Sequence, residues 1–583
     1  MSDVGALSTV VRSLTRDAEE RREAVGLLLT LSEIPRVRQR MGRVQGCIVM
    51  LVSMLNGDDP CASSDAEKLL NALSGNTQNV LHMAEAGYFK PLVLYLKKGS
   101  DMNKILMATT LWKMELTDQY KAILGSEGSI ETLVKMFKSG KLEAKLSALG
   151  ALKNLSTLSE NVQRLIRSGF VSPLLQILFS VTSVFMTLRE PASSILVSIA
   201  QSETILINQD VAQQMLSLLN LTSPVIQYNL LQALNSIMGH ASASKVRLKM
   251  KESGAVQLLL PFLTENNTGI RAAALNLLFN LSTDYLAGEL TQQLGETHLS
   301  IIVNILFTSA LEEEKAAALG LISNIPVNDK KATEILNKLH FLPNLVSFFG
   351  VSSATSAARS RRLTEHIAGV LIRFTVPSEK KLQRQVAELG IIPWLVKVLS
   401  IGSPIAKLRA ATSLSQLSQN SLPLSKAKSP RWSCVPPSAD SFCEVHNGHC
   451  FVKSTFCLVK AGALSPLTKA LEGKEREADE AVLCALATLM QDEIWENGTK
   501  AIAKASGVNA IIRILEVGNV KAQEKALWML ERIFRVEEHK EQYGEAAQQL
   551  LISLAQKGDP SLKPVVAKSL AHLELLQMQS SYF

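Results

Sequence analysis

Five glycines at a fixed interval most strongly constrain what this chain can fold into. Gly5, Gly46, Gly87, Gly128 and Gly169 each stand 41 residues after the one before. The segments that they open share one apolar pattern, and a period of about 40–47 residues is typical of helical solenoids. Glycine suits this position because the chain must reverse after a short helix, in a left-handed backbone conformation that clashes with other side chains.

A single repeat, residues 128–168, shows what each interval encodes. Ile130, Leu133, Val134 and Phe137 have the spacing of a helix with one buried face, and two further helical patterns follow them. No strand pattern competes with these helices. We therefore predict an all-α chain, a right-handed α-solenoid (superhelix) of twelve or thirteen repeats whose long third helices line one concave face.

The spacing loosens after Gly169, with Asp210 at the next step and Gly254 44 residues later, and is then interrupted by one long insertion. Gly390 and Gly462 are 72 residues apart, and the excess lies in a segment rich in Ser, Pro, Cys and His. We divide the chain into repeats in 1–417, an insertion in 418–452, and further repeats with a capping helix in 453–583. Because the helical period vanishes in the insertion, we expect it to be poorly ordered and to protrude.

Composition narrows the class of protein. The net charge is only +8 over 583 residues, a mild basic bias that favours no nucleic-acid partner. No secretory signal and no apolar run of membrane-spanning length is present. The seven cysteines are odd in number and mostly scattered, which indicates a reducing compartment. We expect a cytoplasmic location, with peripheral contact at the plasma membrane as an alternative.

The sequence carries a resemblance to a known family. ALKNLS at 151–156 and LLFNLS at 277–282 look like the third-helix signature of armadillo repeats, and this resemblance covers essentially the whole chain. Residues 443–464, CEVHNGHCFVKSTFCLVKAGAL, resemble a segment of plant U-box armadillo proteins of the senescence-associated ubiquitin-ligase type. The resemblance implies a U-box that recruits a ubiquitin-conjugating enzyme and an armadillo array that binds substrates or adaptors.

This sequence departs from that family in one respect. The repeats are in register from Gly5, and we find no U-box before them. We therefore expect the chain to be the later part of a longer design that binds a partner without transferring ubiquitin by itself, which leaves its status as an enzyme open. The alternative is an armadillo adaptor outside ubiquitination, such as a peripheral membrane or cytoskeletal scaffold.

A row of mostly polar residues is the predicted partner-binding groove. Short polar side chains at one position of the long helices could bind the backbone of an extended peptide, or could merely satisfy neighbouring helix ends. The residues at that position are Lys113, Asn154, Ser198, Asn235, Asn280, Asn324, Arg373 and Gln416. Nuclear-import adaptors of the armadillo class carry Trp four residues earlier, where this chain has Gly150 and Leu231, so a receptor for nuclear-localisation signals is disfavoured.

The insertion concentrates possible metal ligands: Cys434, Cys443, His446, His449, Cys450 and Cys457. Four such side chains suffice for a tetrahedral zinc site. The C-x2-H-x2-H-C spacing is not that of a familiar zinc finger, however, and a mobile loop with free thiols is the alternative. We predict no metal and no other cofactor, and no catalytic residue, since the phosphate-binding loop, GxSxG and HExxH motifs are absent from the sequence.

Overall fold

The computed structural model describes residues 4–180, 182–207, 210–283, 288–350, 357–427 and 441–573. They belong to two compact units, Met1–Leu258 (unit 1) and Leu259–Phe583 (unit 2), and each is described by itself. Within the described residues, one hairpin of β1 (Phe442–Cys443) and β2 (Gly448–His449) is the exception to helical secondary structure. The prediction of an all-α solenoid is confirmed. In the same ranges, no helix combines the length and apolar character that crossing a bilayer requires.

The repeat at residues 128–168 folds as its sequence predicts. Its three helices are α10 (Ser129–Ser139), α11 (Leu142–Leu155) and α12 (Ser159–Arg167). Gly128 precedes α10 with a φ of +80°, the left-handed conformation that the recurring glycine was expected to supply. The predicted apolar face of α10 is buried, because it packs on α11 and on the helices of the neighbouring repeats.

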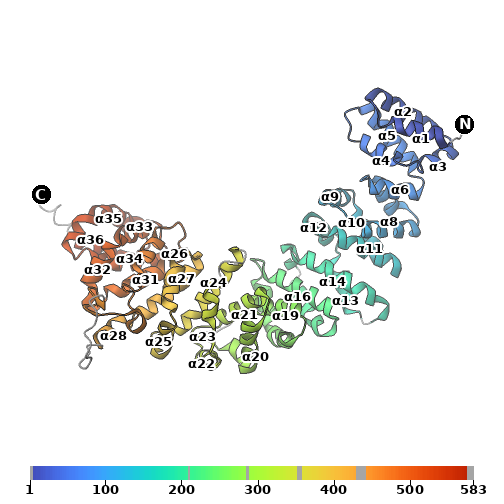
Figure 1. Ribbon diagram of the computed structural model, residues 1–583. Helices are drawn as coiled ribbons and strands as arrows, with labels where there is room; N and C mark the ends of the chain where they lie inside the picture. Colours follow the sequence, from blue (N-terminus) through green and yellow to red (C-terminus); the bar gives the residue numbers. More distant parts are fainter. Residues whose placement is uncertain are drawn as a thin grey trace. The chain divides into compact units, whose positions relative to one another are not determined.

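Unit 1 stacks such repeats through their long helices: α2 packs on α5, and α8, α11, α14 and α16 pack on one another in chain order (Figure 1). The long helices are α2 (Ala18–Leu31), α5 (Pro60–Leu73), α8 (Asp101–Lys113), α11, α14 (Met186–Ala200) and α16 (Pro224–Met238). The shorter ones are α1 (Val4–Ser13), α3 (Pro35–Met41), α4 (Cys47–Met54), α6 (Thr77–Glu85), α7 (Lys90–Lys98), α9 (Asp118–Ser126), α10, α12, α13 (Val171–Phe179), α15 (Val211–Leu218) and α17 (Ser244–Glu252). The helix α18 (Ala255–Leu259) lies at the division between the units.

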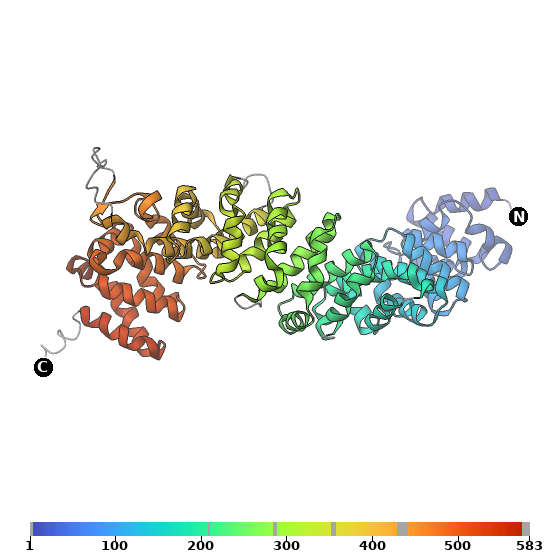
Figure 2. The same cartoon turned by 90° about the horizontal axis from the view of Figure 1, so that it is seen from below.

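Unit 2 repeats the same plan. Each repeat packs on its neighbours in the sequence, so in Figure 2 the colours of this unit follow the chain in order from green to red. Its long helices are α19 (Thr268–Ser282), α21 (Glu312–Asn324), α24 (Ala357–Leu371), α27 (Pro404–Ser418), α31 (Asp479–Ala487) and α34 (Val520–Ile533). The others are η4 (Leu260–Thr264), α20 (Glu289–Thr308), α22 (Lys330–Lys338), α23 (Phe341–Leu345), η5 (Val346–Gly350), η6 (Ile372–Phe374), α25 (Lys380–Glu388), α26 (Ile391–Ile401), α28 (Ser421–Ala427), α29 (Val452–Thr455), α30 (Leu464–Glu472), η8 (Thr488–Met490), η9 (Asp492–Ile494), α32 (Trp495–Lys504), α33 (Gly507–Val517), α35 (Glu537–Lys557), η10 (Pro560–Leu562) and α36 (Lys563–His572).

The insertion differs from its prediction. Residues 428–440 lie outside the described residues, but the segments on either side are ordered. α28 follows α27 directly, and residues 441–452 form the hairpin and the start of α29. The hairpin is anchored to α32, where Asn497 Nδ2 donates to the carbonyl of Glu444 at 3.0 Å. The expectation of a poorly ordered, protruding segment is therefore wrong for residues 418–427, which end α27 and form α28. It is also wrong for residues 441–452, whose packing onto the next repeat could not be read from local composition.

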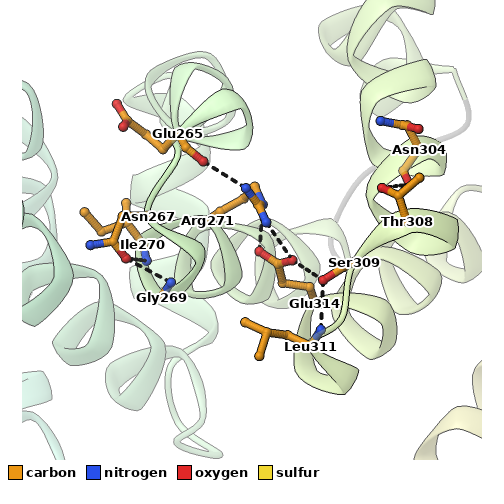
Figure 3. Close-up of polar contacts among 10 residues, drawn as sticks. All are labelled: Glu265, Asn267, Gly269, Ile270, Arg271, Asn304, Thr308, Ser309, Leu311 and Glu314. Carbon is orange, nitrogen blue, oxygen red and sulfur yellow. Dashed lines mark hydrogen bonds and ion pairs between the residues drawn. The ribbon is translucent and has the colours of Figure 1, made fainter.

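A buried ion pair joins two repeats of unit 2 (Figure 3). Arg271 on α19 donates to both carboxylate oxygens of Glu314 on α21, from Nε at 2.7 Å and from Nη2 at 3.0 Å. The Glu314 side chain is fully buried, and Ser309 Oγ also donates to it. The remaining guanidinium nitrogen, Nη1, donates to the carbonyl of Glu265 at 2.9 Å. The bidentate geometry and the added hydrogen bonds compensate for removing both charges from water.

Replacing Glu314 by Ala should destabilise unit 2 by about 3–5 kcal/mol, because it strands the Arg271 guanidinium without its partner. The matched control is Glu312→Ala, which removes a partly exposed carboxylate paired with Lys315 on the surface of the same helix. That change should cost no more than about 1 kcal/mol. Urea denaturation followed by circular dichroism measures both, and equal losses would contradict a special role for the buried pair.

Candidate partner-binding surfaces

Asn154 shows what the predicted polar row does inside the fold. Its side-chain amide donates to the carbonyls of Leu111 at 2.9 Å and Met114 at 2.8 Å, both at the end of α8. The last carbonyls of a helix have no partner within the helix and must be satisfied from outside. Asn154 supplies that partner from the next repeat, so its amide nitrogen is engaged within the protein.

The same arrangement recurs in unit 2. Asn324 Nδ2 donates to Ser282 Oγ at 2.8 Å and approaches the carbonyl of Phe279 at 3.5 Å, both near the end of α19. Gln416 Oε1 accepts a hydrogen bond from Thr375 Oγ1, 2.6 Å away. Each of these residues thus contacts the segment that ends the preceding long helix.

Arg373 departs furthest from the prediction of a groove-facing side chain. It is only 2% exposed, and Nη2 donates to the carbonyl of Ile325 at 2.6 Å while Nη1 donates to Thr333 Oγ1 at 3.0 Å. Burial lowers the pKa of Arg373 to about 10, and the negative charge of Asp329 opposes that shift. The guanidinium is a buried connection between repeats rather than a surface group.

The other members of the row divide by exposure. Ser198, Asn235 and Asn280 are half-buried, and Asn235 Nδ2 donates to the carbonyl of Leu231 in its own helix at 3.0 Å. Of the eight residues, all of which the structure describes, Lys113 is the one with an exposed side chain. The alternative left open by the sequence, that the row satisfies neighbouring helix ends, describes Asn154, Asn324 and Arg373. Partner binding by the row stays a prediction.

Asn154→Ala should destabilise unit 1 by about 1–3 kcal/mol, because two helix-end carbonyls lose their donor. Its exposed neighbour Lys153 provides the control, since Lys153→Ala removes a solvated side chain and should change stability by less than about 0.5 kcal/mol. The measurement is again urea denaturation. An Asn154→Ala protein as stable as the wild type would indicate that the amide faces a partner instead.

Two of the glycines that stand four residues before a row residue, Gly150 and Gly320, contact an aromatic ring of the preceding repeat. A Cβ atom on Gly150 would lie 2.2 Å from Cδ2 of Trp112, so the indole lies directly against the Gly150 backbone. In unit 2, a Cβ atom on Gly320 would lie 2.8 Å from the Phe279 ring. The sequence showed Gly150 where import adaptors have Trp, but the ring that takes up this space is contributed by another repeat and could not be found by that comparison.

Exposed apolar side chains mark one surface of unit 1. They occur on four long helices that contact one another in succession. Three of them, Met102, Leu106 and Tyr228, stand about three or two helical turns before the row residue, on the same side of the helix. We define the long-helix face of unit 1 by these residues: Met102, Leu106, Trp112, Leu142, Met186 and Tyr228. Trp112 is 41% exposed although its ring contacts Gly150. Sequence patterning missed this face because Leu and Met ordinarily indicate core positions.

Unit 2 contains a hollow of about 730 Å³ with aromatic and basic walls. Phe349 and Trp394 form one wall, with their rings stacked at 4.5 Å between centroids and 14° between planes. Arg361 and Arg362 on α24 and Lys397 on α26 supply positive charge, and Glu312 and Glu313 also line the hollow. Both arginines belong to α24 (Ala357–Leu371).

His366 lies beside that hollow, between repeats. Its ring packs edge-on against Phe279 at 5.2 Å, and its Nδ1 atom is buried without a hydrogen-bond partner among the residues that the structure describes. Burial, together with the positive charges of Arg409 and Arg362, lowers the pKa of His366 from 6.5 to about 4. The imidazole is therefore neutral in the folded chain at neutral pH.

This shift makes the stability of unit 2 depend on pH. The unfolded chain takes up a proton near pH 6.5 that the folded chain takes up only near pH 4. The contribution is therefore complete above pH 6.5 and is lost as the pH falls toward 4, with a loss of about 2 kcal/mol at pH 5. His366→Phe keeps a ring beside Phe279 and should flatten this part of the profile in denaturation measured between pH 5 and 7. Parallel profiles for the two proteins would contradict the assignment.

Comparison with known proteins agrees with this architecture. Residues 6–199 match the Armadillo-like family model. U-box domain-containing protein 44 of Arabidopsis thaliana is 28% identical, over 99% of this chain and 76% of its own length. U-box domain-containing protein 24 of Oryza sativa subsp. japonica is also 28% identical, over 99% of this chain and 77% of its own length.

Solved structures share the fold. An engineered protein matches with a TM-score of 0.54 and 19% identity, over 76% of this chain and 97% of its own. A chain from a structure of the cadherin–beta-catenin interaction matches with a TM-score of 0.53 and 14% identity, over 97% of this chain and 98% of its own. The protein therefore has an armadillo-type fold and resembles plant U-box proteins across nearly its whole sequence.

Proposed function

We propose that this armadillo-type chain is the partner-binding part of a U-box-type ubiquitin ligase system, holding a protein substrate or adaptor on its long helices. The observation that carries the proposal is the long-helix face of unit 1. Contiguous exposed apolar surface is typical of protein–protein interfaces, and Trp and Tyr are enriched among residues that dominate binding energy. The similarity to plant U-box proteins supplies the ubiquitination context.

The interior contacts of the row shape this proposal. Asn154 and Arg373 are engaged with neighbouring repeats, so a partner would find few free amides at the row itself. Leu106 and Tyr228 instead stand seven residues before the row positions of their helices, with their side chains exposed. We expect an apolar helix or an extended apolar segment of the partner to cover them, with the row acting as the support beneath the surface.

The partner is identified by crosslinking and then tested by mutation. Benzoylphenylalanine placed at Leu106 or Tyr228 should crosslink a plant protein that the same group at Leu94 does not, because Leu94 is an equally apolar, exposed residue on α7. With that protein purified, Leu106→Asp together with Tyr228→Asp should weaken binding at least about tenfold, equivalent to ~1.4 kcal/mol. Unchanged affinity, or equal loss with Leu94→Asp, would refute the long-helix face as the binding surface.

A fusion tests the ubiquitination half of the proposal. A U-box from one of the relatives is joined to this chain and supplied with activating and conjugating enzymes and the purified partner. The fusion should modify the partner, while the Leu106→Asp, Tyr228→Asp fusion should modify only itself. Binding without modification by the first fusion would favour the alternative of an armadillo adaptor outside ubiquitination.

A further inference from the structure

Four metal-binding side chains of the insertion converge on one point in unit 2. The candidate ligand atoms of Cys443, His446, Cys450 and Cys457 all lie within 4.8 Å of one another. We call these residues the Cys3His cluster. We propose that the cluster is a structural zinc site, in which three thiolates and one imidazole bind a single Zn²⁺ ion and close the insertion onto the solenoid.

Three distances within the cluster, those among Cys443, His446 and Cys457, match a tetrahedral zinc shell. Cys443 Sγ and Cys457 Sγ are 3.8 Å apart, and each lies 3.5 Å from His446 Nδ1. With Zn–S bonds of about 2.3 Å and a Zn–N bond of about 2.0–2.1 Å at tetrahedral angles, the expected separations are about 3.8 Å and about 3.6 Å. A disulfide is excluded in this arrangement, because its sulfurs would be about 2.0 Å apart.

The local backbone aims the four ligands. Cys443 ends β1, His446 lies in the turn of the hairpin, and Cys450 directly follows β2. Asn447, next to His446, has a φ of 44°, and Phe456, next to Cys457, has a φ of 55°. Left-handed backbone is uncommon for a bulky residue such as Phe and persists where surrounding structure requires it. Here it turns the chain so that Cys457 joins the other three ligands.

Only four of the six candidates from the sequence take part. His449 Nδ1 is 2.8 Å from Ser441 Oγ, and the carbonyl of Ser441 accepts a hydrogen bond from the Cys450 backbone N–H at 2.8 Å. Ser441 thus holds His449 away from the cluster and fixes the backbone at Cys450. Cys434 lies outside the described residues. The selection leaves three sulfurs and one nitrogen, a ligand set that zinc favours.

Burial indicates a structural rather than a catalytic metal. None of the four ligands is more than 3% exposed, and the cluster packs against Leu489 and Ile494. Catalytic zinc keeps an open coordination position, whereas four protein ligands complete the shell of a structural site. Without a metal, a buried imidazole and three thiols would stabilise this part of the fold less than apolar side chains would.

The cluster lies where the repeat has lost most of a helix. The repeat that contains α26 has a nine-residue helix, α25, before Gly390, whereas only the four-residue α29 stands close before Gly462. α29 is too short to bury an apolar face of its own. A zinc ion bound by residues before and after α29 would hold this part of the repeat together in place of the missing helix. The hairpin is itself attached to α32 by the hydrogen bond between Asn497 and the carbonyl of Glu444.

The first experiment measures metal in the full chain, purified without a histidine tag. Elemental analysis should find one zinc per chain, retained through dialysis. Cobalt exchanged into the protein should give the intense visible absorption of a tetrahedral site and the charge-transfer bands of thiolate ligands. Zinc at the level found in Cys443→Ser protein, or a Cys443–Cys457 disulfide isolated from the native chain, would overturn the proposal.

Variants separate metal binding from folding. Cys443→Ser and Cys457→Ser should each lose the zinc and lower the unfolding temperature, whereas Cys484→Ser, a half-buried thiol on α31 outside the cluster, should keep one zinc. His446→Cys should keep the metal and shift the cobalt spectrum toward four thiolates, while His446→Ala should lose it. A chelator should lower the unfolding temperature of the wild type but not of Cys457→Ser. Equal zinc content in all of these proteins would refute the site.

Discussion

The stacking of each long helix on the next is the constraint on which each unit depends. A single repeat cannot bury its apolar face alone, so stability arises at the junctions between repeats. At those junctions a helix ends and leaves carbonyls without partners. Asn154 and Arg373, each from the following repeat, donate hydrogen bonds to these carbonyls, the first from its amide and the second from its guanidinium. The polar row is therefore part of the junctions themselves.

A partner can bind only to surface that stays exposed after the repeats have stacked on one another. Where neighbouring long helices approach closely, Trp112 packs against Gly150 and Phe279 packs against Gly320. Apolar residues further along the long helices of unit 1 stay partly exposed, Leu106 at 40% and Tyr228 at 39%. Exposed apolar groups of this kind gain most from a protein partner that removes them from water.

The insertion is held to the neighbouring repeats by a different kind of interaction. At the insertion, the helix before Gly462 is too short to bury an apolar face. Side chains that can bind a metal occupy the place that apolar side chains take in the other repeats. The Cys3His cluster lies against Leu489 and Ile494, so a bound metal would take the role that leucines have at other junctions. The buried pair of Arg271 and Glu314 shows that polar cohesion between repeats is also used elsewhere in unit 2.

The sequence by itself determined the repeat, its three helices and the left-handed glycine at Gly128, because periodic apolar residues and a conformational requirement are local properties. It also identified Cys443, His446, Cys450 and Cys457 among six candidates. Only the tertiary structure decided which four converge, since the turns at Asn447 and Phe456 and the packing on α32 are not encoded in a recognisable spacing. Tertiary structure likewise decided that Asn154 faces the carbonyls at the end of α8. Asn154 and its acceptor Met114 are 40 residues apart in the sequence, so their contact depends on how the repeats stack.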